Sequence, residues 1–161
     1  MILGVGLDVC DVDRIRRALE APTGMRFRTR VFTEEEQAYC EARRRGRFAS
    51  YAARFAAKEA AMKALGTGWA KGVGWQDFEV VRVAGEAPRL VLHGEAADLA
   101  RRRGMTRWLL ALAHTDASAV ASVVVEDGAA FSGAAATAPS RRRDAAARSA
   151  PRRPRARRRT R

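Results

Sequence analysis

The segment that most constrains the fold is an alanine-rich stretch in the middle of the chain, Arg54 to Gly68. It is rich in Ala, Lys, Glu, Met and Leu, the residues with the highest helix propensity, so it is predicted to be the second half of a helix that begins near Phe48. Gly66 stands where a left-handed glycine commonly ends a helix. The spacing of the large apolar residues predicts one buried stripe along this helix: Phe55, Met62 and Leu65.

Four charged residues interrupt this small-residue helix: Arg54, Lys58, Glu59 and Lys63. Residues three or four apart share a face of a helix, so Glu59 and Lys63 are predicted to be neighbours. One interpretation is an exposed ion pair, which would stabilise the helix by about 0.3–0.5 kcal/mol. A catalytic interpretation requires a second acid from elsewhere in the chain.

Asp8 is the candidate for that second acid. It follows an apolar segment in which side chains alternate, so Asp8 shares one strand face with Gly4 and Gly6. The two glycines leave room beside Asp8 for another chain or a ligand. An acid at the end of an apolar strand is typical of a helix cap and of a metal ligand, and the residues alone favour neither. The opposite face of the strand is predicted to be apolar: Leu3, Val5, Leu7 and Val9.

Three motifs occur in a defined order: Gly4-Val5-Gly6-Leu7-Asp8, Arg54-Phe-Ala-Ala-Lys-Glu-Ala, and His114-Thr115. In this order and at this spacing they resemble the small phosphopantetheinyl transferases of the holo-[acyl-carrier-protein] synthase family. The resemblance covers about residues 1–127. The central motif combined with the N-terminal aspartate is far more specific than a glycine-rich loop alone.

The resemblance implies an enzyme of fatty acid biosynthesis that transfers 4′-phosphopantetheine from coenzyme A to a serine of apo-acyl carrier protein. Adenosine 3′,5′-bisphosphate would be the second product. Mg²⁺ is the implied cofactor, with Asp8 and Glu59 as its ligands, because Mg²⁺ takes few carboxylates and keeps water and phosphate oxygens. Glu59 is expected to accept the serine proton, either directly or through a metal-bound water. Lys63 completes the predicted catalytic set and would contact the pyrophosphate.

The resemblance also implies a set of coenzyme A contacts: Arg54, Lys63, Gly66, Thr67, His114 and Thr115. A lone histidine at the end of an apolar strand is usually structural, so the role of His114 rests on the resemblance. Ala113 replaces the hydroxyl residue that the family carries before this histidine, which removes one hydrogen bond. The glycine-rich segment 66–74 has two interpretations, a phosphate-binding loop or a flexible connection.

Arginines are concentrated in the first predicted helix and in the segment after it. Each one alone is consistent with a solvated surface, but together they favour an acidic partner. The resemblance implies that this partner is the acidic acyl carrier protein, and it matches Arg14 to a contact with a carrier acid. Arg26 and Arg28 are further predicted carrier contacts, in a segment whose length varies within the family.

The predicted fold class is α+β, with an antiparallel-rich sheet packed on the long central helix. Asp11 is a predicted helix cap, and Thr33 with Glu36 forms a predicted capping box. No secondary structure is predicted for residues 25–31. The resemblance adds a 4′-phosphopantetheinyl transferase-like fold and a homotrimer with active sites between neighbouring subunits. Helices are expected over 12–20, 33–45, 48–65 and 94–103, and strands over 2–9, 77–83, 89–93, 108–113 and 117–126.

The net charge of +13 is unevenly distributed along the 161 residues. Residues 129–161 hold eleven Arg and one Asp, whereas the first 128 residues hold 20 Lys and Arg against 17 Asp and Glu. The C-terminal segment has one aromatic residue, Phe131, and too little apolar surface to offset the entropy of ordering. We therefore expect a transferase domain over 1–128 and a basic disordered tail over 129–161.

Several functional classes are disfavoured by the sequence. There is no apolar run of about 20 residues that would span a membrane. The N-terminus lacks the charged region followed by an apolar region that is typical of a signal peptide, so none is expected. Cys10 and Cys40 fit no metal or redox spacing, and we expect a cytoplasmic protein. A nucleic-acid-binding protein acting through its tail would explain the arginines, but not Asp8, Glu59 and Lys63. A transferase of the same chemistry acting on carriers of secondary metabolism is the remaining alternative.

Overall fold

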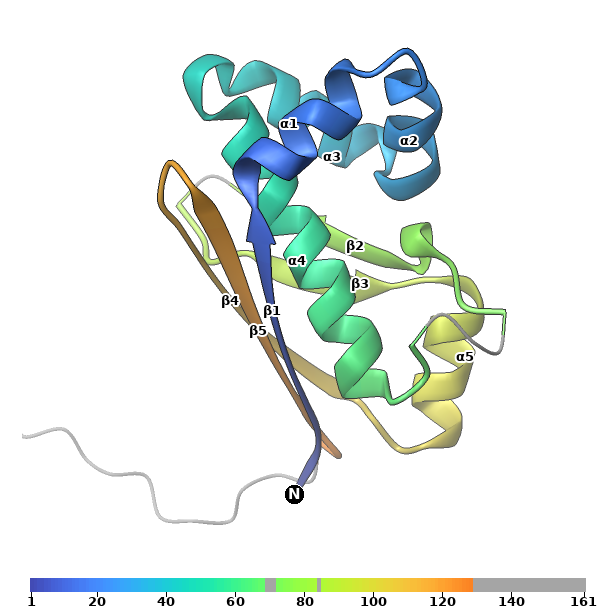
Figure 1. Ribbon diagram of the computed structural model, residues 1–161. Helices are drawn as coiled ribbons and strands as arrows, with labels where there is room; N and C mark the ends of the chain where they lie inside the picture. The colour runs from blue at the N-terminus through green and yellow to red at the C-terminus, as the bar shows by residue number, and fades with distance from the viewer. Residues whose placement is uncertain (69–71, 84, 129–161) are drawn as a thin grey trace, which may run out of the picture. The chain divides into compact units, whose positions relative to one another are not determined.

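The computed structural model describes residues 1–68, 72–83 and 85–128. The predicted tail, and with it the predicted domain boundary after residue 128, lies outside the described residues. The described chain is built around one long helix, α4 (Arg47–Leu65), with a sheet along one side and shorter helices around its two ends (Figure 1). This arrangement confirms the predicted α+β class.

Helix α4 is buried along most of its 19 residues, since small alanine side chains let other elements approach it on several sides. Phe55, Met62 and Leu65 are buried as predicted. Gly66 has a φ of 73° and donates its N–H to the carbonyls of Met62 and Lys63, each at 3.0 Å, so it ends the helix as expected.

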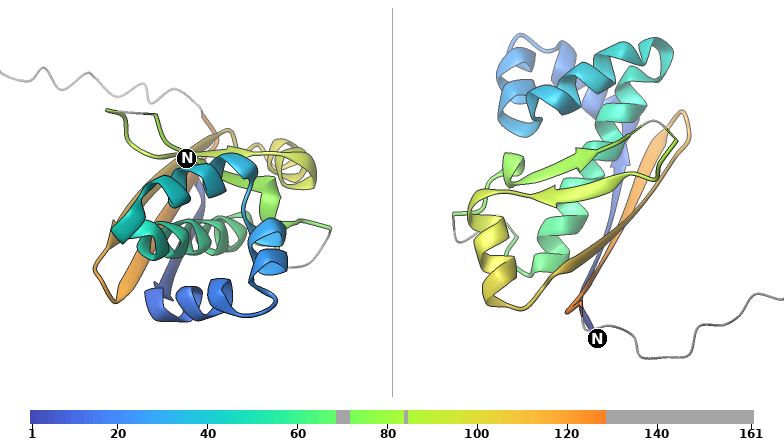
Figure 2. Two further views of the ribbon diagram at one scale, coloured as in Figure 1. Left: turned by 90° about the horizontal axis from the view of Figure 1, so that it is seen from above. Right: turned by 180° about the vertical axis from the view of Figure 1, so that it is seen from behind.

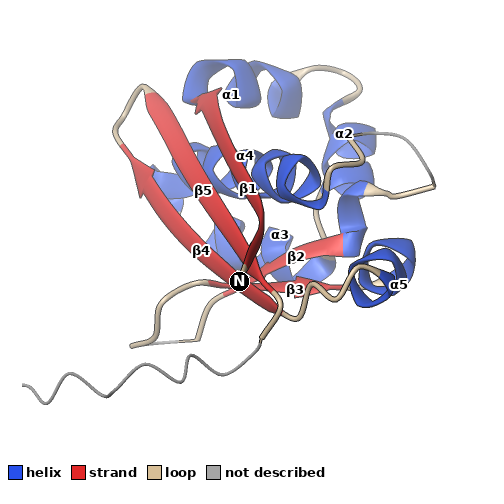
Figure 3. Cartoon of the chain, turned by 90° about the horizontal axis from the view of Figure 1, so that it is seen from below, coloured by secondary structure: helices blue, strands red, loops and turns tan. Residues whose placement is uncertain are grey.

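Two antiparallel sheets flank α4. The larger sheet has the strand order β1-β5-β4, formed by β1 (Ile2–Asp11), β5 (Ser118–Glu126) and β4 (Arg107–His114). The smaller sheet pairs β2 (Phe78–Val81) with β3 (Arg89–Leu92). The helices lie on one side of the β1-β5-β4 sheet and leave its other face bare (Figure 3).

Two glycines bring β1 close to α4. A Cβ atom at Gly4 would overlap the carbonyl oxygen of Ala64, and one at Gly6 would overlap the carbonyl oxygen of Ala60. The room predicted beside these glycines is therefore filled by the chain's own central helix. This close approach places Asp8, two residues after Gly6 on the same strand face, against α4.

Three short helices, α1 (Val12–Glu20), α2 (Gly24–Val31) and α3 (Glu34–Ala42), pack around the N-terminal half of α4 (Figure 1). Asp11 caps α1 by accepting the N–H of Arg14 at 2.8 Å. Asp8 is therefore not the cap of this helix. Thr33 and Glu36 form the predicted capping box of α3. Helix α3 ends earlier than expected, and a 3₁₀ turn over Arg44–Gly46 follows it.

Helix α2 is the one described helix that the sequence did not predict. Its N-cap, Thr23, makes no side-chain capping hydrogen bond, and only Gly24 and Val31 within it are buried. A further 3₁₀ turn covers Trp75–Asp77, and α5 (Gly94–Arg102) lies beside the C-terminal part of α4 (Figure 1). No helix among the described residues is both long and apolar enough to cross a membrane.

Candidate active site

Asp8 and Lys63 form an ion pair between β1 and α4. The Nζ of Lys63 lies 2.8 Å from Oδ1 of Asp8 and donates to the carbonyl of Leu7 at 3.0 Å. The Asp8 side chain is 16% exposed and that of Lys63 is 50% exposed. The cation of Lys63 therefore pairs with the strand acid, and not with Glu59 as in the simple helix-surface interpretation.

Glu59 lies one turn before Lys63 and is half-buried. Its carboxylate makes no hydrogen bond or ion pair with the residues that the structure describes. The pKa of the Cys10 thiol is raised to about 11, mainly by burial; Arg14 lowers it, and the negative charges of Asp8 and Glu59 contribute to raising it. Both carboxylates and Arg14 are thus near one buried thiol.

This carboxylate pair fits Mg²⁺ by its chemistry. The described residues contain no cluster of three or more His, Cys, Asp or Glu side chains that could hold a metal. Mg²⁺ does not need such a cluster, because it is usually bound by one or two carboxylates together with water and phosphate oxygens. Asp8 already holds one cation, the Lys63 ammonium group, and Glu59 is free to accept another.

Arg14 lies next to the carboxylates on the outside of the molecule. It is exposed on α1, and its guanidinium carbon is 5.8 Å from the centre of the Phe55 ring. Phe55 is one helical turn before Glu59. A carrier protein that pairs with Arg14 would therefore be bound close to Glu59.

The other two arginines predicted to bind the carrier differ from each other. Arg26 is exposed on α2. Arg28 is partly buried and lies 3.3 Å from Glu41, which also pairs with Arg47 at 2.9 Å and accepts the Tyr51 hydroxyl at 2.9 Å. Arg28 thus shares the Glu41 carboxylate with Arg47, whereas Arg26 is fully on the surface.

A second group of predicted residues lines a pocket of about 360 Å³. Arg54 is 4% exposed there, its guanidinium carbon lies 4.0 Å from the centre of the Tyr39 ring, and its Nε has no hydrogen-bond partner within the described chain. No acidic residue is among the described residues that line the pocket, so the positive charge of Arg54 is available to an anion. The polar lining residues are Tyr39, Arg43, Ser50, Arg54, Arg82 and His114.

The two groups lie on opposite sides of α4. Arg54 and Lys63 are nine residues apart, which at about 100° per residue turns their side chains about 180° away from each other. Figure 2 shows the same division, with α1 on one side of α4 and the β2–β3 sheet on the other. The structure therefore brings Asp8, Glu59 and Lys63 together, and it brings Arg54 and His114 together, but within one chain it separates these groups.

The remaining predicted contacts are at the ends of elements. Thr67 lies one turn beyond Lys63, and its hydroxyl donates to the carbonyl of Gly68 at 3.1 Å. The Thr115 hydroxyl accepts the N–H groups of Ala117 and Ser118, at 3.2 and 3.1 Å, and so shapes the turn between β4 and β5. Part of the predicted glycine-rich phosphate loop, residues 69–71, lies outside the described residues.

Sequence reasoning missed four residues around these sites. Tyr39, Arg43 and Arg82 line the Arg54 pocket, and Lys58 is fully buried one turn after Arg54. The spacing of Lys58 from Arg54 was a usable signal, because both fall on one face of a helix predicted to be buried. Nothing local indicates that Arg82 would lie near Arg54, since that requires the packing of β2 on α4.

Comparisons with known proteins identify the family of the chain. The 4′-phosphopantetheinyl transferase superfamily model matches residues 4–121. The holo-[acyl-carrier-protein] synthase of Solibacter usitatus is 49% identical over 127 residues, which are 79% of this chain and 100% of that protein. The enzyme of the same name from Anaeromyxobacter dehalogenans strain 2CP-1 is 56% identical over 128 residues, 78% of this chain and 97% of that protein.

Solved structures are similar as well. The crystal structure of the Neisseria meningitidis holo-[acyl-carrier-protein] synthase has a TM-score of 0.70 at 31% identity, covering 78% of this chain and 99% of that one. The Helicobacter pylori enzyme in complex with coenzyme A has a TM-score of 0.65 at 27% identity, covering 76% of this chain and 99% of that one.

Proposed function

The chain belongs to the 4′-phosphopantetheinyl transferase superfamily, and we propose that it transfers 4′-phosphopantetheine from coenzyme A to a serine of apo-acyl carrier protein. The products are holo-acyl carrier protein and adenosine 3′,5′-bisphosphate. The observation that carries this conclusion is the 49% identity over the full length of a holo-[acyl-carrier-protein] synthase. The confirmed resemblance extends to the predicted fold, which matches solved synthases.

The chain's own residues suit a phosphoryl transfer. The serine oxygen attacks the pyrophosphate phosphorus nearest the pantetheine, and the bond from that phosphorus to the departing phosphate oxygen breaks. Glu59, which has a free carboxylate, accepts the serine proton directly or through a bound water. Lys63 offers its ammonium group to the pyrophosphate. When bound by Asp8 and Glu59, Mg²⁺ would neutralise charge on the phosphate oxygens.

The Arg54 pocket is proposed to hold the adenosine bisphosphate part of coenzyme A. Its buried guanidinium, with Arg43, Arg82 and His114 around it, suits a phosphate group, because charged donors in a low-dielectric site bind anions strongly. The unpartnered Nε of Arg54 is a donor that such a ligand can satisfy. Gly66, Thr67 and Thr115 remain proposed contacts at the edges of the two groups.

Because one chain separates the two groups, we propose a homotrimer in which each active site combines residues of two copies. The bare face of the β1-β5-β4 sheet supports this assembly. Val5, Leu7 and Val9 are 62%, 57% and 62% exposed on it. Cross-strand neighbours continue the apolar surface, and an apolar face of this kind marks a protein interface. The rows are Val5-Val124-Leu109, Leu7-Ser122-Ala111 and Val9-Val120-Ala113.

The carrier protein is proposed to dock on α1 and α2. Arg14 and Arg26 are exposed there and can pair with the acidic residues of a carrier. Arg28, held by Glu41, is expected to contribute less. A cytoplasmic location is also proposed, because Cys10 and Cys40 are buried free thiols, as is common in a reducing compartment.

The proposed function is tested by incubating the purified chain with coenzyme A, Mg²⁺ and an apo-acyl carrier protein, and measuring the carrier by mass spectrometry. We expect the added mass of one phosphopantetheine group and release of adenosine 3′,5′-bisphosphate. A carrier domain from secondary metabolism, assayed in parallel, tests the alternative substrate. A higher kcat/KM on that domain would assign the enzyme to secondary metabolism, and modification of neither carrier would refute the proposal.

A further inference from the structure

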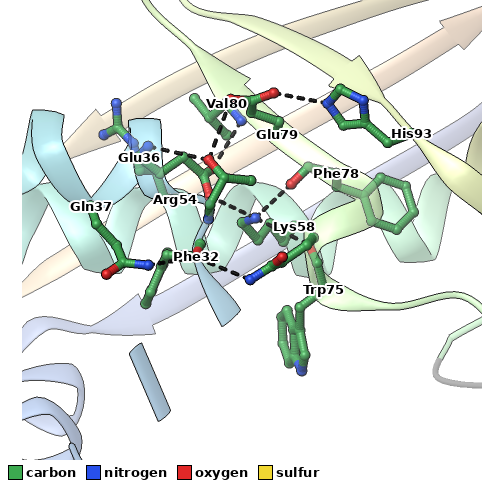
Figure 4. Close-up of polar contacts among 12 residues, drawn as sticks. Phe32, Glu36, Gln37, Arg54, Lys58, Trp75, Phe78, Glu79, Val80 and His93 are labelled. Atoms are coloured by element: carbon green, nitrogen blue, oxygen red, sulfur yellow. Dashed lines mark hydrogen bonds and ion pairs between the residues drawn. The ribbon is translucent and has the colours of Figure 1, made fainter. Parts of the chain in front are cut away.

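Lys58 and Glu36 form an ion pair in the interior of the molecule, outside the two groups described above (Figure 4). Lys58 is 0% exposed and Glu36 is 1% exposed. The Nζ of Lys58 lies 2.7 Å from Oε2 of Glu36 and donates to the carbonyls of Phe78 at 2.6 Å and Trp75 at 3.1 Å. All three ammonium hydrogens therefore have an acceptor.

Besides Lys58, the Glu36 carboxylate accepts hydrogen bonds from two backbone N–H groups. One carboxylate oxygen, Oε2, accepts the N–H of Thr33 at 3.0 Å and so closes the capping box of α3. The other oxygen, Oε1, accepts the N–H of Val80 in β2 at 2.9 Å. Together, Lys58 and Glu36 join α4 to the start of α3, to the turn at Trp75 and to the backbone of β2.

Stability alone does not account for this pair. Burial lowers the pKa of Lys58, and the charge of Glu36 opposes that shift. The attraction between the two charges therefore only offsets the free energy that is needed to bury them. Replacing a buried ion pair by apolar residues of similar volume is often neutral or stabilising. An apolar pair would lack the directional hydrogen bonds that fix the position of α4 relative to β2.

That geometry determines the shape of the Arg54 pocket. Arg54 is one turn before Lys58 on the same face of α4, and Val80, whose N–H is held by Glu36, lines the same pocket with Arg82. Arg54 thus projects from the helix side of the pocket, while Val80 in β2 and Arg82, which directly follows β2, form the other side. The Lys58–Glu36 pair connects these two sides, because Lys58 belongs to α4 and Glu36 binds both Lys58 and the N–H of Val80.

We propose that Lys58 and Glu36 are positioning residues for coenzyme A, which fix the separation of α4 from β2 and thereby place Arg54 opposite Arg82. This inference rests on the proposed placement of the adenosine bisphosphate in the Arg54 pocket. The pair acts on substrate only through the pocket that it holds in shape. It leaves the Asp8, Glu59 and Lys63 group, on the other side of α4, unchanged.

The test is a double replacement that removes both charges and keeps the volume, Glu36→Leu with Lys58→Met. We expect this variant to fold with a Tm close to that of the unaltered chain. Its Kd for coenzyme A, measured by calorimetry, should rise roughly 10- to 100-fold, because the loss of one hydrogen bond to a charged group has an effect of that size. The KM for coenzyme A should rise likewise, while the KM for the carrier stays the same.

Glu36→Gln is the conservative companion, since it keeps the shape of the side chain and one oxygen that can accept the N–H of Thr33 or of Val80, but loses the charge. It should bind coenzyme A more tightly than the double variant does. Asp98→Ala removes an exposed ion pair with Arg101 on α5, of 2.7 Å, and serves as the control that changes neither Tm nor Kd. Coenzyme A binding by the double variant equal to that of the unaltered chain would overturn the inference.

Failure of the double variant to fold would also overturn it, since the pair would then be required for the fold and not for the pocket. Arg54→Ala separates this inference from the proposed function. If Arg54→Ala binds coenzyme A normally, the placement of the ligand is wrong. If Arg54→Ala loses binding and the double variant does not, only the positioning role of Lys58 and Glu36 is wrong.

Discussion

Asp8 and Glu59 differ in their partners within the fold, and we expect neither to be needed for folding. Asp8 pairs with Lys63, whose side chain is half exposed, and Glu59 has no partner within the described chain. Pairs of this exposure stabilise a protein by about 0–1 kcal/mol. The two carboxylates can therefore be replaced with little effect on stability, which makes their role in catalysis testable.

We predict that Asp8→Ala and Glu59→Ala each lower turnover by roughly 100-fold or more, as expected for a group that stabilises charge in the transition state. Their Tm should change little. Turnover is measured at limiting Mg²⁺, and Mg²⁺ binding by calorimetry in the absence of substrates. Glu86→Ala, an exposed acid far along the chain, is the control. If either variant keeps normal turnover at limiting Mg²⁺, that carboxylate is not a metal ligand.

Two buried thiols predict how stability depends on pH. Burial raises the pKa of Cys10 to about 11 and that of Cys40 to about 12, from an ordinary value of 9.0. Above pH 9 the unfolded chain loses thiol protons that the folded chain keeps. The free energy of unfolding therefore falls with rising pH, by up to about 1.4 kcal/mol per pH unit for each thiol.

The Cys10→Ala and Cys40→Ala double variant should be less stable at pH 7.5 but should lose less stability between pH 8.5 and 10. Urea unfolding at both ends of this range measures the difference. Tyr51, with a raised pKa, and Lys58, with a lowered one, are present in both proteins, so their contributions cancel. An equal pH slope in the two proteins would show that these thiols are not protected by burial.

At the scale of elements, local signals predicted most of the fold. Caps at Asp11 and Thr33, the glycine stop at Gly66 and alternating strands gave four of the five described helices and all five described strands. Helix α2 was missed because Thr23 makes no side-chain cap and the helix buries almost no apolar side chain. Its formation depends on contacts with neighbouring elements, which the sequence does not display.

The candidate site was predicted less completely, for a related reason. The sequence provided candidate residues, but how they group in space depends on packing between elements. The pairing of Lys63 with Asp8 requires β1 to lie against α4, which depends on Gly4 and Gly6. The pairing of Lys58 with Glu36 joins α4 to α3 and has no local signature. Helix geometry alone could have shown that Arg54 and Lys63 point apart.

The close contact of β1 with α4 gives a prediction for this element. At Gly6 a methyl group would overlap the carbonyl of Ala60, so Gly6→Ala should destabilise the protein by about 1–3 kcal/mol and shift Asp8 away from Lys63. Gly46→Ala is the matched control, because a Cβ there meets nothing within 4 Å. Urea unfolding and turnover measure both effects. A Gly6→Ala variant as stable as the control would mean that β1 does not pack this closely.

At the scale of the whole molecule, the separation of the two groups predicts complementation between inactive chains. Arg54→Ala and Lys63→Ala should each be nearly inactive as pure proteins. In trimers assembled at random from equal amounts of both, about one quarter of the shared sites would combine an intact Arg54 with an intact Lys63. Refolding the two chains together should therefore restore part of the activity.

Val5→Asp provides the control for assembly, because it places a charge on the bare sheet face, where Val5 is 62% exposed. It should give a folded monomer by light scattering, with little activity. Mixed trimers of Arg54→Ala and Lys63→Ala that form but stay inactive would show that both groups act within a single chain. The proposed sharing of sites between copies would then be wrong.

The basic segment 129–161 gives the last prediction. It carries eleven Arg and one Asp, and relatives of the chain match 127 or 128 of its residues. Its arginines could raise the local concentration of an acidic carrier, but such attraction is screened beyond about 8 Å at physiological salt. The chain truncated after residue 128 should therefore keep its kcat at 0.15 M salt, with a modest rise in carrier KM that fades as salt increases. Steady-state kinetics over a salt series test this. A large loss of kcat at every salt concentration would mean that the segment contributes to the enzyme itself, and that the boundary after residue 128 is wrong.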